Sequence, residues 1–119
     1  MKEEFRSRLF SYVVKLINFL KACPRDIITR EIISQLMRSG TSIGANYSEA
    51  QSASSRKDYI NYFTHSLKSA NETKFWLNVM LESSLISQEK IPDCKSLLVE
   101  TNELGKIFAS SIVTMKKQG

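Results

Sequence analysis

The sequence predicts an all-α protein, an antiparallel up-and-down four-helix bundle made by a single domain over residues 1–119. Apolar residues recur at alternating spacings of three and four in four long stretches, which is the period of an amphipathic helix. Only four glycines and two prolines interrupt the chain, so a few long helices are favoured over many short strands. Short segments join the stretches, and helices joined in this way pack antiparallel. The expected helices span roughly 3–22, 25–51, 55–84 and 88–116.

The first expected helix has two adjacent apolar seams, each a line of residues along one side of the helix. The seams contain Phe5, Leu9, Tyr12, Leu16 and Phe19, and Phe10, Val13, Ile17 and Leu20. Two adjacent seams make a wide stripe, which is typical of a helix that faces a core. Pro24 ends this helix, because the residue before a proline resists the α conformation.

The second expected helix passes through a segment rich in small residues. Its seam begins at Ile28, Ile32 and Leu36 and continues through the segment Gly40–Ala50 at helical spacing. Each interior glycine costs about 1 kcal/mol relative to alanine. A loop near Gly40 is therefore the alternative to one continuous helix.

The third expected helix has two seams of different character. One is apolar: Ile60, Phe63, Leu67, Ala70, Leu77, Leu81. The other mixes aromatic and small residues: Tyr59, Tyr62, Ser66, Ser69, Thr73, Trp76, Met80. We expect the first seam to face the core and the second to face another chain. Ser54 or Ser55 is the expected N-cap.

The fourth expected helix repeats the three-and-four spacing from Cys94 to Met115. Ser87 is a candidate cap, and Pro92 lies near the start, where proline is tolerated best. Lys116 and Lys117 suit the negative end of the helix dipole.

The charge balance favours a polyanionic partner. The chain has 17 Lys and Arg against 12 Asp and Glu, a formal net charge of +5. Solvated helix faces explain most of these residues, and a phosphate-binding surface for RNA or DNA is the alternative. The candidate nucleic-acid-binding residues are Arg25, Arg30, Arg38, Arg56, Lys57 and Lys68.

A second group of residues indicates a close helix contact or an oligomer interface. Small residues around Gly40 and Gly44 allow a neighbouring helix to approach, although the segment is too polar for a bilayer. Tyr and Trp are enriched at subunit interfaces, and base stacking is a further use of them. The candidate residues are Gly40, Gly44, Asn46, Tyr47, Glu49, Tyr59, Tyr62 and Trp76.

No catalytic, metal or cofactor site is expected. His65 is the only histidine and lacks partners of metal-ligand type, and the isolated carboxylates Glu49 and Glu72 fit structural hydrogen bonds or ion pairs. Cys23 and Cys94 form no ligand pattern and are expected to be buried, reduced side chains. The chain starts without an apolar signal segment and has no stretch long enough to span a bilayer, so a cytoplasmic protein without a membrane partner is expected.

Three segments of the chain resemble a known family. They are Gly40–Ala50 (GTSIGANYSEA), Ser54–Tyr59 (SSRKDY) and Leu67–Leu77 (LKSANETKFWL). The chain is similar, from about Phe5 to Met115, to bacterial four-helix-bundle proteins, some of them encoded by intervening sequences within 23S ribosomal RNA genes.

The resemblance implies a ring-like homopentamer without enzymatic activity. A related bundle, the accessory protein of diversity-generating retroelements, binds nucleic acid through a basic pentameric surface, and fold alone does not fix function. The likeness extends to residue type at Asn46, Glu49, Lys57, Asp58, Glu72 and Trp76, and transfers no catalytic role to them.

Two functional hypotheses follow. The first is a homo-oligomeric binding module for structured RNA or DNA, in which neutralising Arg38, Arg56 and Lys57 would reduce the salt dependence of binding. The second is a structural adaptor that binds another, unknown protein through exposed seams, with no role for nucleic acid.

Overall fold

The computed structural model describes residues 2–118, which contain four α-helices and no β-strand. The elements are α1 (Lys2–Lys21), α2 (Ile27–Ala50), α3 (Arg56–Glu82), the short 3₁₀ turn η1 (Gln88–Lys90) and α4 (Ile91–Gln118). The all-α prediction is confirmed, and the observed bounds differ from the expected ones by three residues or fewer.

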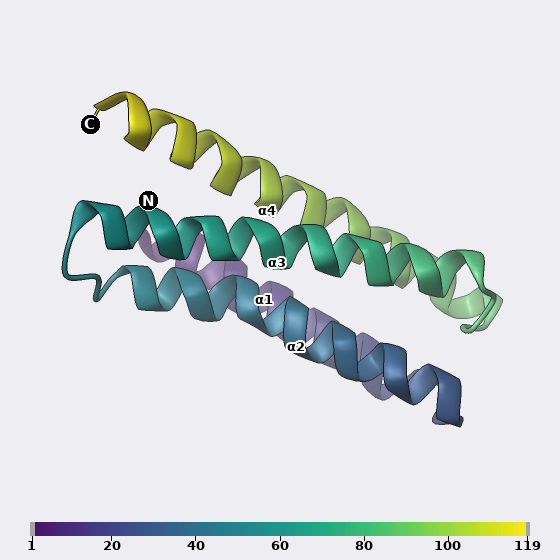
Figure 1. Cartoon of the computed structure of the whole chain (residues 1–119). Coiled ribbons are helices and arrows are strands. Elements are labelled where there is room, and N and C mark those ends of the chain that lie inside the picture. Colours follow the sequence, from purple (N-terminus) through teal and green to yellow (C-terminus); the bar gives the residue numbers. More distant parts are fainter. Residues whose placement is uncertain (1, 119) are drawn as a thin grey trace.

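The helices form an elongated helical bundle 47 Å long and 24 × 20 Å across (Figure 1). Consecutive helices run antiparallel, with the α1–α2 and α3–α4 connections at one end and the α2–α3 connection at the other. The α2–α3 and α3–α4 pairs pack most extensively, and α1 packs on both α2 and α4. Among the described residues, no helix has both the length and the apolarity that a membrane span requires.

The helix starts follow local capping chemistry. The Asp26 carboxylate accepts hydrogen bonds from the Thr29 backbone N–H (3.2 Å) and hydroxyl (2.7 Å), which fixes the start of α2 and lowers the pKa of Asp26. Ser55 is the N-cap of α3, as predicted, and accepts a hydrogen bond from the Asp58 N–H at 3.0 Å. Ser87 instead precedes the 3₁₀ turn and makes no side-chain capping bond, because α4 begins only at Ile91.

The second helix does not break at its glycines. α2 continues through Gly40 and Gly44 as far as Ala50, so a loop near Gly40 was the wrong alternative. Gly40 is buried where α2 crosses α1, and a Cβ atom there would overlap Leu16 Cδ2. Close packing of α1 on α2 therefore requires glycine at this position and offsets its low helix propensity.

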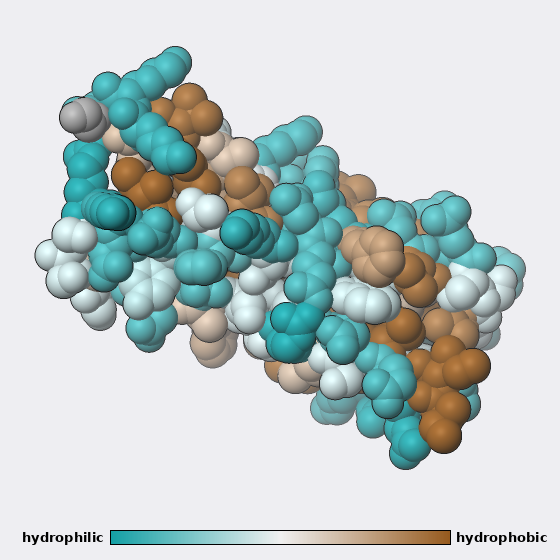
Figure 2. Space-filling view, in the orientation of Figure 1, coloured by the Kyte–Doolittle hydropathy of each residue, from teal (hydrophilic) through white to brown (hydrophobic). Residues whose placement is uncertain are grey.

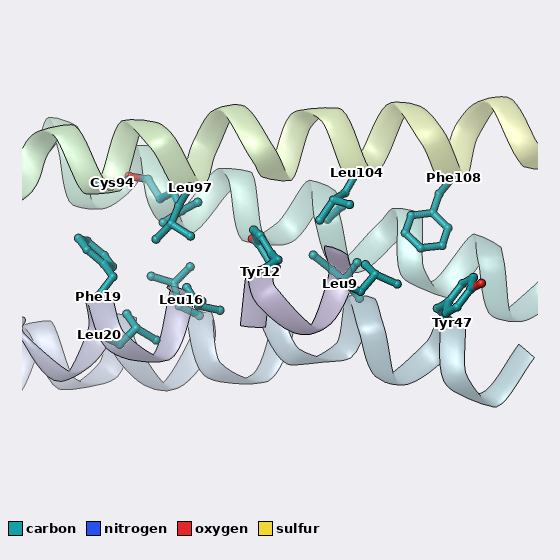
Figure 3. Close-up of a cluster of buried hydrophobic side chains, with 14 of the residues drawn as sticks. Leu9, Tyr12, Leu16, Phe19, Leu20, Tyr47, Cys94, Leu97, Leu104 and Phe108 are labelled. Carbon is teal, nitrogen blue, oxygen red and sulfur yellow. Dashed lines mark hydrogen bonds between the residues drawn. The ribbon is translucent and has the colours of Figure 1, made fainter. Parts of the chain in front are cut away.

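The core runs along the whole bundle and ends in an aromatic cluster. Figure 3 shows the side chains of α1 and α4, among them Leu16, Phe19 and Leu97, directed toward one another between the helices. At the end where α2 turns into α3, each of the four helices contributes one ring: Phe5, Tyr47, Phe63, Phe108. The ring centroids of this cluster lie 5.1–6.3 Å apart. These ring–ring contacts hold all four helices together at this end of the bundle.

The mixed seam of α3 faces α2 of the same chain, which corrects the expectation of a second chain there. Ser66, Thr73 and Met80 are fully buried. The Ser66 hydroxyl donates to the Ile43 carbonyl at 2.8 Å, and the Thr73 and Ser39 hydroxyls share a hydrogen bond of 2.9 Å. Small hydroxyl side chains allow the two helices to approach while every buried polar group stays hydrogen-bonded.

Candidate nucleic-acid interface

The six basic residues predicted to bind nucleic acid do not gather on one surface. Arg25 and Arg30 lie at the start of α2, whereas Arg56 and Lys57 lie in the first turn of α3. The 24 residues of α2 separate these two groups by about 36 Å. Lys68 lies near the middle of α3. The predicted set is therefore spread along nearly the whole bundle.

Two of these six residues hold the fold together. Arg38 forms an ion pair with Glu72 of α3. Arg56 Nη2 donates to the Met115 carbonyl at 2.8 Å, and it therefore binds one of the carbonyls that a helix C-terminus leaves without a partner. Neutralising Arg38 or Arg56 would disturb contacts within the chain, so the variants expected from the sequence do not test phosphate binding cleanly.

Contacts between α3 and α4 fix how the two helices are aligned. Going forward along α3 and backward along α4, the contacting pairs are Arg56 with Met115, Phe63 with Phe108, Ala70 with Gly105, and Lys74 with Asn102. One step forward along α3 thus corresponds to one step backward along α4. The alignment places any residue of α3 level with a known residue of α4.

This alignment brings lysines of the two helices level in pairs. Lys57 of α3 lies level with Lys117 of α4, and Lys68 with Lys106. The two lysines of each helix are eleven residues apart, which is three helical turns or roughly 16 Å. Lys95 extends the same row on α4 by a further eleven residues. The two helices therefore carry a ladder of cations, of which sequence analysis found only the α3 side.

We define the lysine face as the surface of α3 and α4 directed away from α1 and α2. Its basic residues are Lys57, Lys68, Lys74, Lys95, Lys106, Lys116 and Lys117, and all except the half-buried Lys74 are exposed. Figure 2 shows hydrophilic side chains over the middle of α3 and at the end of α4. The signal that could have revealed this face is the eleven-residue spacing of lysines in both helices.

Two of the three acidic residues of α4 lie on its other side. Glu100 accepts two hydrogen bonds from Arg8 of α1 at 2.7 and 2.8 Å, and Glu103 also interacts with Arg8. Together these interactions raise the pKa of Arg8. Asp93 lines a groove with Lys15 of α1. Asp93 and Glu100 therefore face α1, while Glu103, three residues before Lys106, lies between Arg8 and the lysines of α4.

The acids of α3 lie on more than one side of the helix. Glu72 pairs with Arg38 of α2, and Asp58, four turns earlier, lies on the same side of α3. Glu82, the last residue of α3, shares the side that carries Lys68, and Glu72 lies one turn after Lys68, where Arg38 pairs with it. The lysine face therefore carries seven lysines and Glu82, with Glu72 and Glu103 beside it.

The predicted interface residues separate into buried and surface groups. Tyr47 is buried in the aromatic cluster, and Tyr59 stacks on Phe63 with a centroid distance of 4.8 Å. Tyr62 is half-buried, and Trp76 Nε1 donates to Glu72 at 3.2 Å. The aromatic residues predicted from the sequence mainly pack within the chain.

The small-residue segment forms one wall of a surface groove. Gly44 and Ser48 of α2 line a groove of about 590 Å³, with Phe10 of α1 on the other wall. The Phe10 side chain is 74% exposed. Asn46 does not line this groove and donates to the Ser42 carbonyl of its own helix at 2.9 Å, while Glu49 is exposed at the end of α2.

The titratable residues considered for catalysis are separated. Glu72 already binds Arg38 and Trp76, His65 lies seven residues earlier on α3, and Glu49 lies in the last turn of α2. Within residues 2–118 no three His, Cys, Asp or Glu side chains are grouped closely enough to hold a metal ion.

The two cysteines are buried and free. Burial raises the pKa of both thiols, to about 11 for Cys94, which is typical of unreactive structural cysteines.

Comparison with known proteins identifies a family and similar solved structures. The sequence model of the 23S rRNA-intervening sequence protein family matches residues 3–110. The crystal structure of a protein of unknown function from the S23 ribosomal protein family of Bacteroides thetaiotaomicron is similar to this chain, with a TM-score of 0.75 and 32% sequence identity. The match covers 90% of this chain and 96% of the other. No curated protein matches.

Proposed function

Since this chain belongs to the 23S rRNA-intervening sequence protein family, we propose that it is a non-enzymatic, homo-oligomeric module that binds structured RNA or DNA through its lysine face. The observation that carries the proposal is the gathering of seven lysines on the surface of α3 and α4, where they outnumber the acids. A phosphate backbone presents regularly spaced negative charges, and exposed lysines bind them as point charges. Contacts of this kind give affinity with little sequence preference.

Exposed apolar side chains on the other helices support assembly of several copies. Five large hydrophobic residues of α1 and α2 are exposed: Phe10, Val14, Ile27, Ile28 and Met37. Figure 2 shows part of this hydrophobic surface at the end of the bundle where α2 begins. Burying these side chains between copies would stabilise an oligomer and leave the lysine face open. A homopentamer, as the resemblance implies, would carry five times the net charge of one chain.

The proposal is tested by comparing two charge-matched double variants. Lys68→Gln with Lys106→Gln removes one pair of the ladder, and Arg25→Gln with Arg30→Gln removes the same charge at the start of α2. Affinity for a hairpin RNA and a DNA duplex is measured across a salt series. On B-DNA each lost phosphate contact reduces the slope of log K against log salt by about 0.9, so the lysine variant should lose about 1.8.

The arginine variant should retain the wild-type slope. Equal slopes for wild type and both variants would refute the lysine face as the binding surface. Sedimentation of the same samples measures the assembly, and a monomer at micromolar concentration would refute the homo-oligomer.

The α1–α2 groove favours a second candidate function, an adaptor for another protein. An apolar helix of a partner fits a groove that has exposed Phe10 on one wall and small residues on the other. This function predicts no binding of nucleic acid at low salt. It also predicts that a nuclease-treated pull-down recovers one protein in stoichiometric amount, and that Phe10→Ser abolishes the recovery.

A further inference from the structure

The lysine face carries one exposed aromatic side chain, Phe75. Its ring is 58% exposed, and it is oriented by Trp76, whose ring meets it edge-on at a centroid distance of 4.9 Å and an angle of 77°. The Trp76 indole is in turn tied to Glu72 by its Nε1–H. Phe75 therefore presents a ring surface to solvent from a supported position.

The alignment of α3 and α4 places a second apolar side chain level with Phe75. Val99 of α4 lies opposite it and is 65% exposed. The Lys68–Lys106 pair lies seven residues away, roughly 10 Å along the axis, and Lys95 lies four residues beyond Val99 on the other side, roughly 6 Å. Cations thus lie beyond the apolar pair at both ends, while Glu72, which Arg38 pairs, and Glu103 lie within about one turn of it.

Amide side chains accompany this apolar pair. Asn71 and Asn78 are exposed on α3, one turn before and one turn after Phe75. Asn102 of α4 accepts a hydrogen bond from Lys74 at 3.3 Å. An exposed aromatic ring, flanking cations and nearby amides are the three groups that bind the base, the phosphates and the polar base edge of a nucleotide.

We propose that Phe75 is a stacking platform for an unpaired base, with its phosphates held by the lysines on either side. The inference rests on the proposed nucleic-acid function and names the form of the ligand. A continuous duplex keeps its bases stacked inside and presents only phosphates, so it leaves Phe75 without a partner. A second copy of the lysine face is disfavoured because seven like charges would oppose seven others. The preferred ligand contains single-stranded nucleotides, as in a hairpin loop.

The chain contains its own reporter for this contact. Trp76 is the only tryptophan and touches the ring on which the base would stack. Oligo(dT) titrated at low salt should lower the Trp76 emission, whereas a blunt DNA duplex with the same number of phosphates should not. An abasic oligonucleotide of equal length serves as a control for charge, and it should bind without lowering the emission.

Substitution of Phe75 separates stacking from charge. Phe75→Ala should weaken oligo(dT) binding roughly 5- to 150-fold, the equivalent of about 1–3 kcal/mol for one stacked base, and leave duplex binding unchanged. Phe75→Tyr should retain binding, because it keeps the ring. Val113→Ala is the matched control, since Val113 is similarly exposed (53%) on α4 about four turns from the apolar pair. Far-UV circular dichroism checks that each variant is folded.

Two failures are distinguishable. Unchanged oligo(dT) binding in folded Phe75→Ala, with binding still lost in Lys68→Gln/Lys106→Gln, would refute stacking and preserve the proposed function. Unchanged binding in both variants would refute the proposed function itself. Capture of an acidic protein that competes with oligo(dT), together with equal affinity for single strand and duplex, would also overturn the stacking role.

Discussion

The α1–α4 and α2–α3 contacts contain the same two kinds of interaction, but the side chains that make them differ in size. Each contact has an Arg–Glu ion pair at the surface, Arg8 with Glu100 and Arg38 with Glu72. Beneath it, each has a buried pair of hydroxyls. These are Tyr12 with Thr101 between α1 and α4, and Ser39 with Thr73 between α2 and α3. Small residues let α2 and α3 pack extensively, whereas α1 and α4 are held further apart by large side chains (Figure 3).

The two contacts differ in how their stabilising interactions are distributed among the residues. Across α2–α3 it is distributed over many small contacts, so removing one hydroxyl leaves the others in place. Across α1–α4 much of it is concentrated in Tyr12, which fills the space between the helices with a ring that is only 2% exposed. Since cavity size sets the cost of truncating a core side chain, the two contacts should respond very differently to alanine.

The largest predicted effect is that of Tyr12→Ala compared with Ser39→Ala. Loss of the buried ring should lower the free energy of unfolding by about 3–5 kcal/mol. Ser39→Ala should cost about 1 kcal/mol, because Thr73 keeps its second hydrogen bond, to the Ser69 carbonyl at 2.7 Å. Urea denaturation at neutral pH measures both. Equal losses would show that the α1–α4 contact is no more concentrated than the other.

The second prediction uses the one hydroxyl among these four that titrates. Burial raises the pKa of Tyr12 to about 12 in the folded state, from an ordinary value of 10.0. Between these pH values the unfolded chain loses its proton first, so stability falls as pH rises from about 10 to about 12. The full loss is about 3 kcal/mol on the linkage relation. Cys94, with a pKa raised to about 11 from 9.0, adds a loss that begins near pH 9.

Tyr12→Phe isolates the tyrosine contribution. This variant should cost about 1 kcal/mol at neutral pH through the lost hydrogen bond, yet lose less stability than wild type above pH 10. Urea midpoints at neutral and alkaline pH measure the difference. Ser39→Ala is the matched control, because neither Ser39 nor Thr73 titrates in this range. If Tyr12→Phe and Ser39→Ala follow the same pH dependence, Tyr12 is not the source of the alkaline loss.

The helices were predictable because their signals are local. Three-and-four spacing predicted all four helices to within three residues at each end, and Ser54 or Ser55 was expected as the cap of the third, which is Ser55. The direction in which the mixed seam of α3 faces was predicted wrongly. Periodicity shows that Ser66 and Thr73 share one side of a helix, but the partner on that side is α2, whose contacts are more than twenty residues away in sequence.

The candidate site was only partly predictable, because it depends on alignment between helices. Lys57 and Lys68 were identified as basic residues of α3, but their level partners Lys117 and Lys106 become visible only when α4 is placed beside α3. Likewise, no local sequence pattern shows that the Arg56 guanidinium donates to the carbonyl of Met115, fifty-nine residues later. Charge counting gives the number of cations, and the packing decides which of them remain available.

The smallest predicted effect distinguishes two glycines that the sequence could not distinguish. Gly40 lies where α2 meets both Leu16 of α1 and Thr73 of α3, so Gly40→Ala forces the buried Leu16 to move. Overpacking costs about 1–3 kcal/mol, of which alanine's higher helix propensity recovers about 1 kcal/mol, for a net loss of up to about 2 kcal/mol.

At Gly44 an added Cβ would meet only Leu9 Cβ at an ordinary 3.8 Å. Gly44→Ala should therefore stabilise the fold by up to about 1 kcal/mol. The two denaturation midpoints should move in opposite directions. Stabilisation by both would show that the α1–α2 crossing has room at Gly40, whereas a loss in Gly44→Ala that grows on dilution would place Gly44 at a contact between copies.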